Sequence, residues 1–218
     1  RGAFPCFDEP QFKIEWQVTM TVPAGDVALT NTPPDETTSD GEFETTRFMR
    51  TKPMPSYLIA LAVGPFEFVE VEDTSIPCRV VTPKGKAWMA KDAAENTPPI
   101  LAALEDYFGR PYPYRKLDLI AVPEFNPGAM ENVGLITYRE TLLLLDPETA
   151  TVAQKRSLSS VNAHEIAHMW YGNLVTMEWW DDLWLNESFA SWMGEKITHQ
   201  VFPEFGLDVT SVRGNEGA

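Results

Sequence analysis

The stretch His164-Glu165-Ile166-Ala167-His168 predicts a helix in the second half of this chain and a metal-binding pair of histidines on that helix. On an α-helix two histidines four positions apart project from one face, one turn above the other. Two imidazoles in that arrangement can bind a single metal ion. Glu165 would lie about 100° around the helix from His164 and about 60° from His168, which places its carboxylate beside the metal.

A third ligand follows in Trp184-Leu185-Asn186-Glu187-Ser188. Eighteen residues separate His168 from Glu187, enough for a turn and a second helix packed antiparallel to the first. Two histidines and one glutamate leave a fourth position open, and an open position distinguishes a catalytic zinc site from a closed structural one. A histidine pair alone is equally typical of polar residues on a helix that binds no metal. The added Glu187 favours zinc on His164, His168 and Glu187.

The residue types also predict a reaction. Zinc in such a site polarises a carbonyl group and promotes the attack of water on it. Glu165 can accept the proton of that water and deliver it to the leaving nitrogen. The prediction is metal-assisted hydrolysis of an amide, with Glu165 as the catalytic base.

A second motif, Gly128-Ala129-Met130-Glu131-Asn132, is predicted to lie in a loop between two apolar runs, 117–122 and 135–145. Glycine permits the close approach of a peptide to the main chain. Glu131 would be a fixed carboxylate near the metal, suited to pairing with the α-ammonium group of a substrate. Taken alone, the pentapeptide favours a simpler interpretation of Glu131 as a solvated loop acid.

Together these motifs resemble those of the gluzincin zinc aminopeptidases of the aminopeptidase N type, the family that also includes leukotriene hydrolase. The resemblance rests on Gly128 to Asn132, His164 to His168, Gly172 to Met177 and Trp184 to Glu187. Ala3 to Pro10 is similar to a stretch of the family's N-terminal domain. These motifs occur in the family's order over most of the chain, which makes the match specific.

The resemblance implies a role for each site residue. It implies one zinc ion per chain on His164, His168 and Glu187, with Glu165 as general base and Glu131 as the anchor of the substrate amine. The implied activity is removal of N-terminal residues from peptides that have a free amino terminus. The implied substrate-binding set is Gly128, Ala129, Met130, Glu131 and Asn132.

Two functional residues of the family have no counterpart in this sequence: the tyrosine that stabilises the oxyanion, and a second side chain that binds the substrate amine. We expect both to lie outside this chain. We therefore expect this chain to be an internal part of a larger enzyme and to be weakly active or inactive by itself. Two alternatives stay open: a catalytically silent metal-binding module that binds peptides, and an epoxide hydrolase similar to leukotriene hydrolase.

The composition predicts a globular protein. The 218 residues are 44% hydrophobic, which is enough apolar material for a core in one or two domains. A net charge of −15 argues against nucleic acid as a partner. Because no apolar run approaches the ~20 residues of a membrane span, we expect no transmembrane segment in this chain and a soluble protein. The compartment stays open, with cytoplasmic favoured over secreted. The two cysteines, Cys6 and Cys78, are expected to be free thiols.

The hydrophobic pattern predicts an α+β fold in two parts. Residues 1–74 would be the C-terminal part of a β-rich N-terminal domain, and residues 75–218 the N-terminal part of a thermolysin-like catalytic domain. Alternating or strand-like runs predict strands at 12–22, 27–30, 43–51, 57–71, 76–82, 117–122 and 135–145. The helical period predicts helices at 88–108, 151–171 and 185–200, the first of which ends at Gly109.

Two further expectations concern the surroundings of the site. Histidines that bind a metal need hydrogen-bond partners of their own, and Asp181, Asp182 and Glu195 are candidates that the sequence does not rank. Aromatic side chains close to a metal more often exclude water than stack on substrate, so we expect them in the core. These aromatics are Trp170, Tyr171, Trp179, Trp180, Trp184, Phe189 and Trp192.

Overall fold

The computed structural model describes residues 3–206 of the chain. Its strands are β1 (Thr19–Pro23), β2 (Val27–Thr30), β3 (Pro34–Ser39), β4 (Phe43–Phe48), β5 (Leu61–Gly64), β6 (Phe66–Glu70), β7 (Cys78–Pro83), β8 (Leu117–Val122), β9 (Ala129–Met130) and β10 (Leu135–Arg139). Its helices are α1 (Lys91–Phe108), α2 (Glu140–Leu143), α3 (Val152–Ala167) and α4 (Leu183–Val201), with short 3-10 helices η1 (Ser56–Leu58), η2 (Ala87–Ala90), η3 (Trp180–Asp182) and η4 (Pro203–Phe205).

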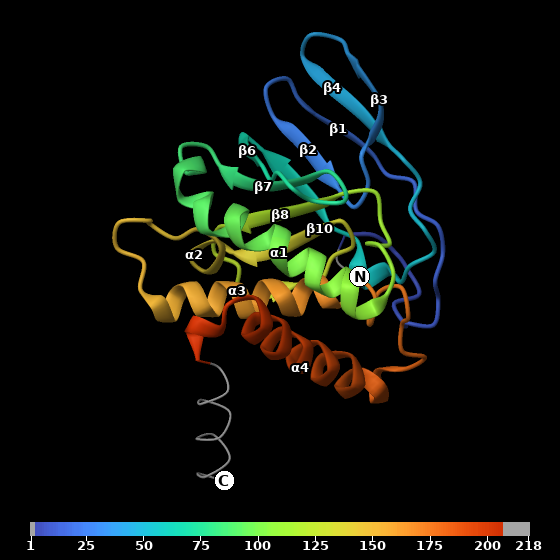
Figure 1. Cartoon of the computed structure of the whole chain (residues 1–218). Coiled ribbons are helices and arrows are strands. Elements are labelled where there is room, and N and C mark those ends of the chain that lie inside the picture. Colours follow the sequence, from blue (N-terminus) through green and yellow to red (C-terminus); the bar gives the residue numbers. More distant parts are fainter. Residues whose placement is uncertain (1–2, 207–218) are drawn as a thin grey trace.

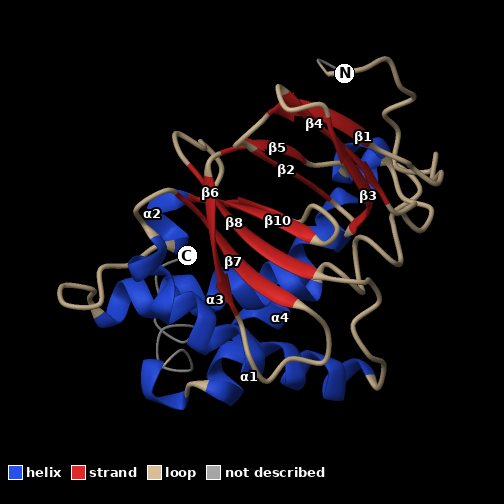
Figure 2. Cartoon of the chain, turned by 90° about the horizontal axis from the view of Figure 1, so that it is seen from above, coloured by secondary structure: helices blue, strands red, loops and turns tan. Residues whose placement is uncertain are grey.

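A mixed five-stranded sheet forms the centre of the molecule, with the strand order β6-β7-β8-β10-β9. The three inner strands β7, β8 and β10 are parallel, while β6 and β9 are antiparallel to their neighbours. Figures 1 and 2 show the helices α1, α3 and α4 on one side of this sheet and the strands β1 to β5 on the other. The predicted α+β class is confirmed.

The inner strand β8 is buried on both faces, because its successive side chains point to opposite sides of the sheet and both sides are covered there. On β8, Leu119 and Ala121 pack into the helix layer, whereas Ile120 faces the other way and meets Leu29 and Ala60 of the N-terminal part. This double burial explains why 117–122 reads as a nearly continuous apolar run. It also joins the two halves of the chain through a common core.

A separate three-stranded sheet, β1-β4-β3, projects from the body of the molecule (Figure 1). The sequence pattern did not predict β3, whose six residues Pro34–Ser39 are all exposed. A strand with no buried face shows no alternation of apolar and polar residues in the sequence. β3 is stabilised by its antiparallel pairing with β4 instead.

Several predicted boundaries were wrong. The run 12–22 forms a strand only from Thr19, and the run 57–71 is split into η1, β5 and β6. The run 135–145 leaves the sheet at Arg139 and continues as α2. The end of α1 at Gly109 is confirmed: Gly109 has a φ of 60°, a left-handed conformation that glycine adopts without steric cost.

The proposed boundary between residues 74 and 75 stays a prediction. β6 lies before it and β7 after it, and all of β6 pairs with residues 79–83 of β7 in the central sheet. Cys6 and Cys78 are both free thiols, as expected, and burial raises the pKa of Cys78 to about 12. Within residues 3–206, none of the helices has the length and apolarity that crossing a bilayer requires.

Gly134 lies at a close contact between the N-terminal part and the central sheet. Its φ is +67°, and a methyl group there would overlap the main-chain oxygen of Asn31. The Asn31 side chain donates hydrogen bonds to the carbonyls of Leu58 and Val133, both at 2.8 Å. On the other side, Lys116 Nζ donates to the Gly134 carbonyl at 2.6 Å. The start of β10 is therefore fixed from two directions.

Replacing Gly134 by alanine should lower the free energy of unfolding by at least about 2 kcal/mol, because left-handed strain adds to the displacement of Asn31. Gly25→Ala is the matched control, since its φ is +98° but no atom lies within 4 Å of an added Cβ. Urea unfolding followed by circular dichroism measures both. Equal losses in the two variants would contradict the close contact.

Candidate metal centre and substrate site

α3 carries the two histidines and begins with a capping box. Thr151 Oγ1 accepts a hydrogen bond from the Gln154 main-chain nitrogen at 3.2 Å, and Gln154 Oε1 accepts one from the Thr151 nitrogen at 2.9 Å. The helix ends at Ala167, earlier than predicted, with His168 as its C-terminal cap. The two imidazoles nevertheless lie together, with ring centroids 4.6 Å apart.

α4 packs directly along α3 in the opposite direction, as predicted (Figure 1). The two helices approach closely at Gly194, where an added Cβ would lie 2.9 Å from the Ser160 carbonyl oxygen and 3.2 Å from His164 Cβ. Gly194 follows Glu187 by two turns, and Ser160 precedes His164 by one. The antiparallel arrangement therefore brings Glu187 to the histidines.

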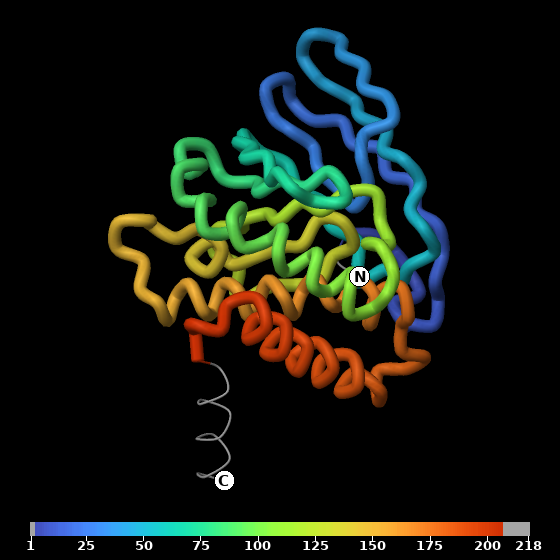
Figure 3. Tube along the Cα trace, in the orientation of Figure 1, coloured from blue at the N-terminus to red at the C-terminus, as the bar shows by residue number. Residues whose placement is uncertain are grey.

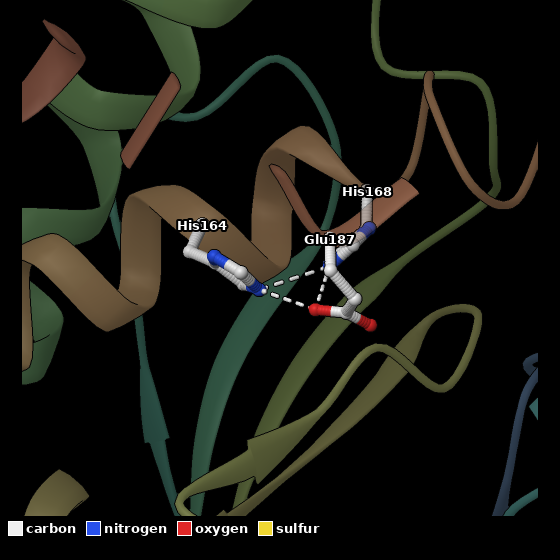
Figure 4. Close-up of side chains that lie close together, drawn as sticks. All are labelled: His164, His168 and Glu187. Carbon is white, nitrogen blue, oxygen red and sulfur yellow. Dashed lines mark hydrogen bonds and ion pairs between the residues drawn. The ribbon is translucent and has the colours of Figure 1, made fainter. Parts of the chain in front are cut away.

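The three predicted metal ligands converge (Figure 4). His164 Nε2 lies 3.0 Å from His168 Nε2, and Glu187 Oε2 lies 3.5 Å from the first and 3.8 Å from the second. In a tetrahedral zinc site with bonds of about 2.0–2.2 Å, ligand atoms are about 3.3–3.6 Å apart. The donor set and its spacing fit one metal ion of that kind.

The candidate metal centre is closed on one side and open on the other. His168 is fully buried, while 47% of the Glu187 side chain is accessible. Burial lowers the pKa of His168, which favours the neutral imidazole that a metal requires. The interaction with His164 holds the pKa of Glu187 below its ordinary value, against the effect of burial.

Asn186 is a site residue that the sequence analysis missed. Its Oδ1 lies 2.9 Å from His168 Nδ1, so that His168 directs Nε2 towards Glu187. Gly172 makes room for this contact, since a methyl group there would overlap Asn186 Oδ1. The three acids expected in this role, Asp181, Asp182 and Glu195, are exposed. The sequence offered one indication of this role, which is that Asn186 directly precedes the candidate ligand Glu187 on α4.

Two buried carboxylates adjoin the histidines. Glu131 and Glu165 are 6% and 5% exposed, and their oxygens and a His168 nitrogen all lie within 4.8 Å of one another. The interpretation of Glu131 as a solvated loop acid is therefore wrong. Burial, followed by the charges of Glu131 and Glu187, raises the pKa of Glu165 well above its ordinary value. Within the described residues, Glu165 Oε2 has no hydrogen-bond partner.

The motif Gly128 to Asn132 is partly a strand rather than a loop. Ala129 and Met130 form β9, which pairs antiparallel with β10 and is one of the two edge strands of the sheet in the described part of the chain, the other being β6. Met130 packs against a small core of Met54, Leu58 and Val133. The Asn132 side chain accepts a hydrogen bond from Thr137 Oγ1 at 3.0 Å and donates one to the Ile59 carbonyl at 3.4 Å.

Asparagine side chains also fix the position of Glu131. Asn173 Nδ2 donates to the Glu131 carbonyl at 2.8 Å, and Asn186 Nδ2 lies 3.5 Å from Glu131 Oε1. Lys13 Nζ in turn donates to the carbonyls of Asn173 and Leu174, at 3.2 and 3.0 Å. The N-terminal segment, blue in Figure 3, thus runs beside the orange loop that follows α3.

The seven aromatic residues near the site differ in burial, and three of them, Tyr171, Trp180 and Phe189, are only partly buried. Trp170 is 4% exposed and stacks on Phe108 with ring centroids 5.0 Å apart, so its predicted place in the core is confirmed. Trp179, Trp184 and Trp192 are 45%, 61% and 49% exposed, and for them the prediction was wrong. Helical spacing fixes which residues share a face of α4, whereas neighbouring segments determine whether that face is covered.

Replacing Asn186 by alanine should weaken divalent metal binding about 10- to 100-fold, because His168 would lose the acceptor that orients its ring. Competition with a chelator measures the affinity. Ser188→Ala, an exposed change two residues further along α4, should bind metal as the unaltered chain does. Unchanged affinity in Asn186→Ala would show that His168 needs no such partner.

Comparison with known proteins places these residues in a family. Residues 92–215 match the peptidase family M1 domain, and residues 1–58 match the peptidase M1 N-terminal domain. The chain is similar to aminopeptidase M1-A of Oryza sativa subsp. japonica, with 46% identity over 208 residues that cover 95% of this chain and 24% of that protein.

Two animal proteins are similar as well. Glutamyl aminopeptidase of Bos taurus is 45% identical over 193 residues, which cover 88% of this chain and 20% of that protein. Puromycin-sensitive aminopeptidase of Caenorhabditis elegans is 43% identical over 210 residues, 95% of this chain and 22% of that protein. The chain spans less than a quarter of the length of these relatives. The match of the M1 domain to more than half of the chain, together with the convergent histidines and glutamates, shows that this protein belongs to peptidase family M1.

Proposed function

We propose that this chain supplies the metal centre and the amine-binding carboxylate of a zinc-dependent aminopeptidase that hydrolyses the N-terminal peptide bond of its substrates. The observation that carries the proposal is the convergence of His164, His168 and Glu187 beside two buried carboxylates. The names of the relatives support it, since each is called an aminopeptidase.

One zinc ion would be held by His164, His168 and Glu187, where it would supply Lewis-acid polarisation of the scissile carbonyl. Glu165 is the proposed base. Its Oε2 is buried beside the ligands without a partner in the described residues, so it is available to take the proton of the attacking water. The same oxygen then gives that proton to the leaving nitrogen.

Glu131 is proposed to bind the α-ammonium group of the substrate. Its carboxylate is buried next to that of Glu165, and like charges at this separation favour a cation between or beside them. Asn173 and Asn186 hold Glu131 in place, which would set its distance from the metal. A fixed distance would select the first peptide bond of the substrate.

The peptide main chain is proposed to lie along β9. As an edge strand of the sheet in the described residues, β9 has an edge to which an extended peptide can add by main-chain hydrogen bonds. Gly128 and Ala129 would line the peptide there. Met130 and Asn132, whose side chains pack inward or bind Thr137 and Ile59, would contribute through their main chain.

Glu165→Gln should retain zinc yet lose at least about 10²-fold in turnover of an aminoacyl anilide, because an amide does not accept the proton of water. The assay uses this chain and a version extended at both ends. His168→Ala is the comparison and should lose zinc, as metal analysis would show. Turnover in metal-loaded Glu165→Gln would remove Glu165 from the role of base. Zinc binding without turnover in every version would favour the silent peptide-binding module.

Acetylation of the substrate amino terminus should abolish cleavage, because an amide cannot form the ion pair with Glu131. Glu131→Ala should lower kcat/KM for free-amine substrates, and the loss corresponds to about 1.5 to 3 kcal/mol of transition-state stabilisation, the contribution of one charge-assisted hydrogen bond. Product analysis by mass spectrometry identifies the bond cleaved. Efficient cleavage of acetylated peptides at internal bonds would instead indicate an endopeptidase.

A further inference from the structure

Three cationic side chains of this acidic protein converge on one cavity away from the candidate metal centre. The whole chain has 17 lysine and arginine residues against 32 aspartate and glutamate residues. Arg50, Lys52 and Arg115 nevertheless line a single cavity of about 350 Å³, which we call the basic pocket. Its other walls are Glu15, Asn31, Thr32, Thr51, Pro53, Tyr114 and Val133.

The backbone positions these cations together. Arg50 and Lys52 are exposed on either side of the buried Thr51, so in an extended segment both side chains emerge on the same face. Lys52 Nζ donates to the Pro113 carbonyl at 2.6 Å, which ties this segment to the one that carries Arg115. Residues far apart in sequence are thus brought to one opening.

The polar wall of the basic pocket is rigid because its groups already have partners. Thr51 Oγ1 accepts a hydrogen bond from the Trp16 nitrogen at 2.9 Å, and Thr32 Oγ1 donates to the Met49 carbonyl at 2.5 Å. Asn31 is held by Leu58 and Val133. These groups shape the cavity. Of its three cations, Lys52 already donates to the Pro113 carbonyl, and Arg50 contacts Glu15 and Gln17 at 3.4 and 3.5 Å.

The positive charge of the basic pocket is only partly compensated. Glu15 is its single acidic wall residue, and it contacts Arg50 at 3.4 Å while both side chains are more than half exposed. Such an ion pair contributes little in water. Within the described residues, Arg115 has neither a hydrogen bond nor an ion pair. Its guanidinium group can therefore bind two oxygens of a ligand at once.

We propose that the basic pocket binds a small multivalent oxyanion, which carries either a phosphate group or two or more carboxylates. The volume lies in the range of small-molecule sites, and the cations supply bidentate and point-charge contacts to oxygen. The overall negative charge of the chain repels anions elsewhere, so binding would be local to this cavity. The proposal is independent of the aminopeptidase activity.

The test is a titration of the isotope-labelled chain with sodium phosphate and, separately, with citrate, at an ionic strength held constant with sodium chloride. Amide chemical shifts report where each probe binds, and calorimetry reports the affinity. We expect saturable shifts at residues 50–52 and 114–115. Arg115→Ala and Lys52→Ala should each weaken binding at least about tenfold. A response to only one probe would support the proposal and identify the oxyanion class.

Arg110→Ala is the matched control, because Arg110 is an exposed arginine outside the basic pocket. It should bind as the unaltered chain does, and circular dichroism should show that all three variants are folded. An equal loss in Arg110→Ala would mean that only general charge matters and would overturn the proposal. Shifts confined to residues 164–168, or no saturable binding of either probe, would overturn it as well.

Discussion

Gly194 lets α4 approach α3 closely enough for Glu187 to reach two histidines on another helix. A larger side chain at this position would meet the main chain of Ser160 and the Cβ of His164. Gly172 has a similar role for a ligand's hydrogen-bond partner, because its lack of a side chain leaves room for Asn186 to contact His168. The positions of all three candidate ligands therefore depend on close packing at two glycines, because protein interiors yield little to an added methyl group.

Buried asparagines connect this helix pair to the rest of the molecule. Asn31, Asn173 and Asn186 reach respectively from the N-terminal part, from the loop after α3 and from α4. All three bond to residues between Glu131 and Val133. An amide both donates and accepts, so one side chain can join two segments. The N-terminal part of the chain is in this way a component of the site rather than a separate neighbour.

The site concentrates acidic side chains in a buried place. Glu131 and Glu165 are buried side by side, and Glu187 lies close enough to influence the pKa of Glu165. Burying like charges together is unfavourable unless cations accompany them. A metal ion on the histidine side and a substrate ammonium on the Glu131 side would meet this requirement. The basic pocket of the same chain is positively charged instead. Cationic ligands and the proposed oxyanion would therefore bind at separate places.

The sequence by itself determined the features that follow from local backbone periods. The four-residue spacing of His164 and His168, the alternation that predicts an α+β fold, and the glycine that ends α1 all depend on fixed rotations per residue. Only the tertiary structure decided that Glu131 is buried, that Asn186 orients His168, that β3 forms without an apolar face, and that Trp184 is exposed. Burial and hydrogen-bond partners depend on segments distant along the chain, such as the 102 positions between Asn31 and Val133, and no local period encodes them.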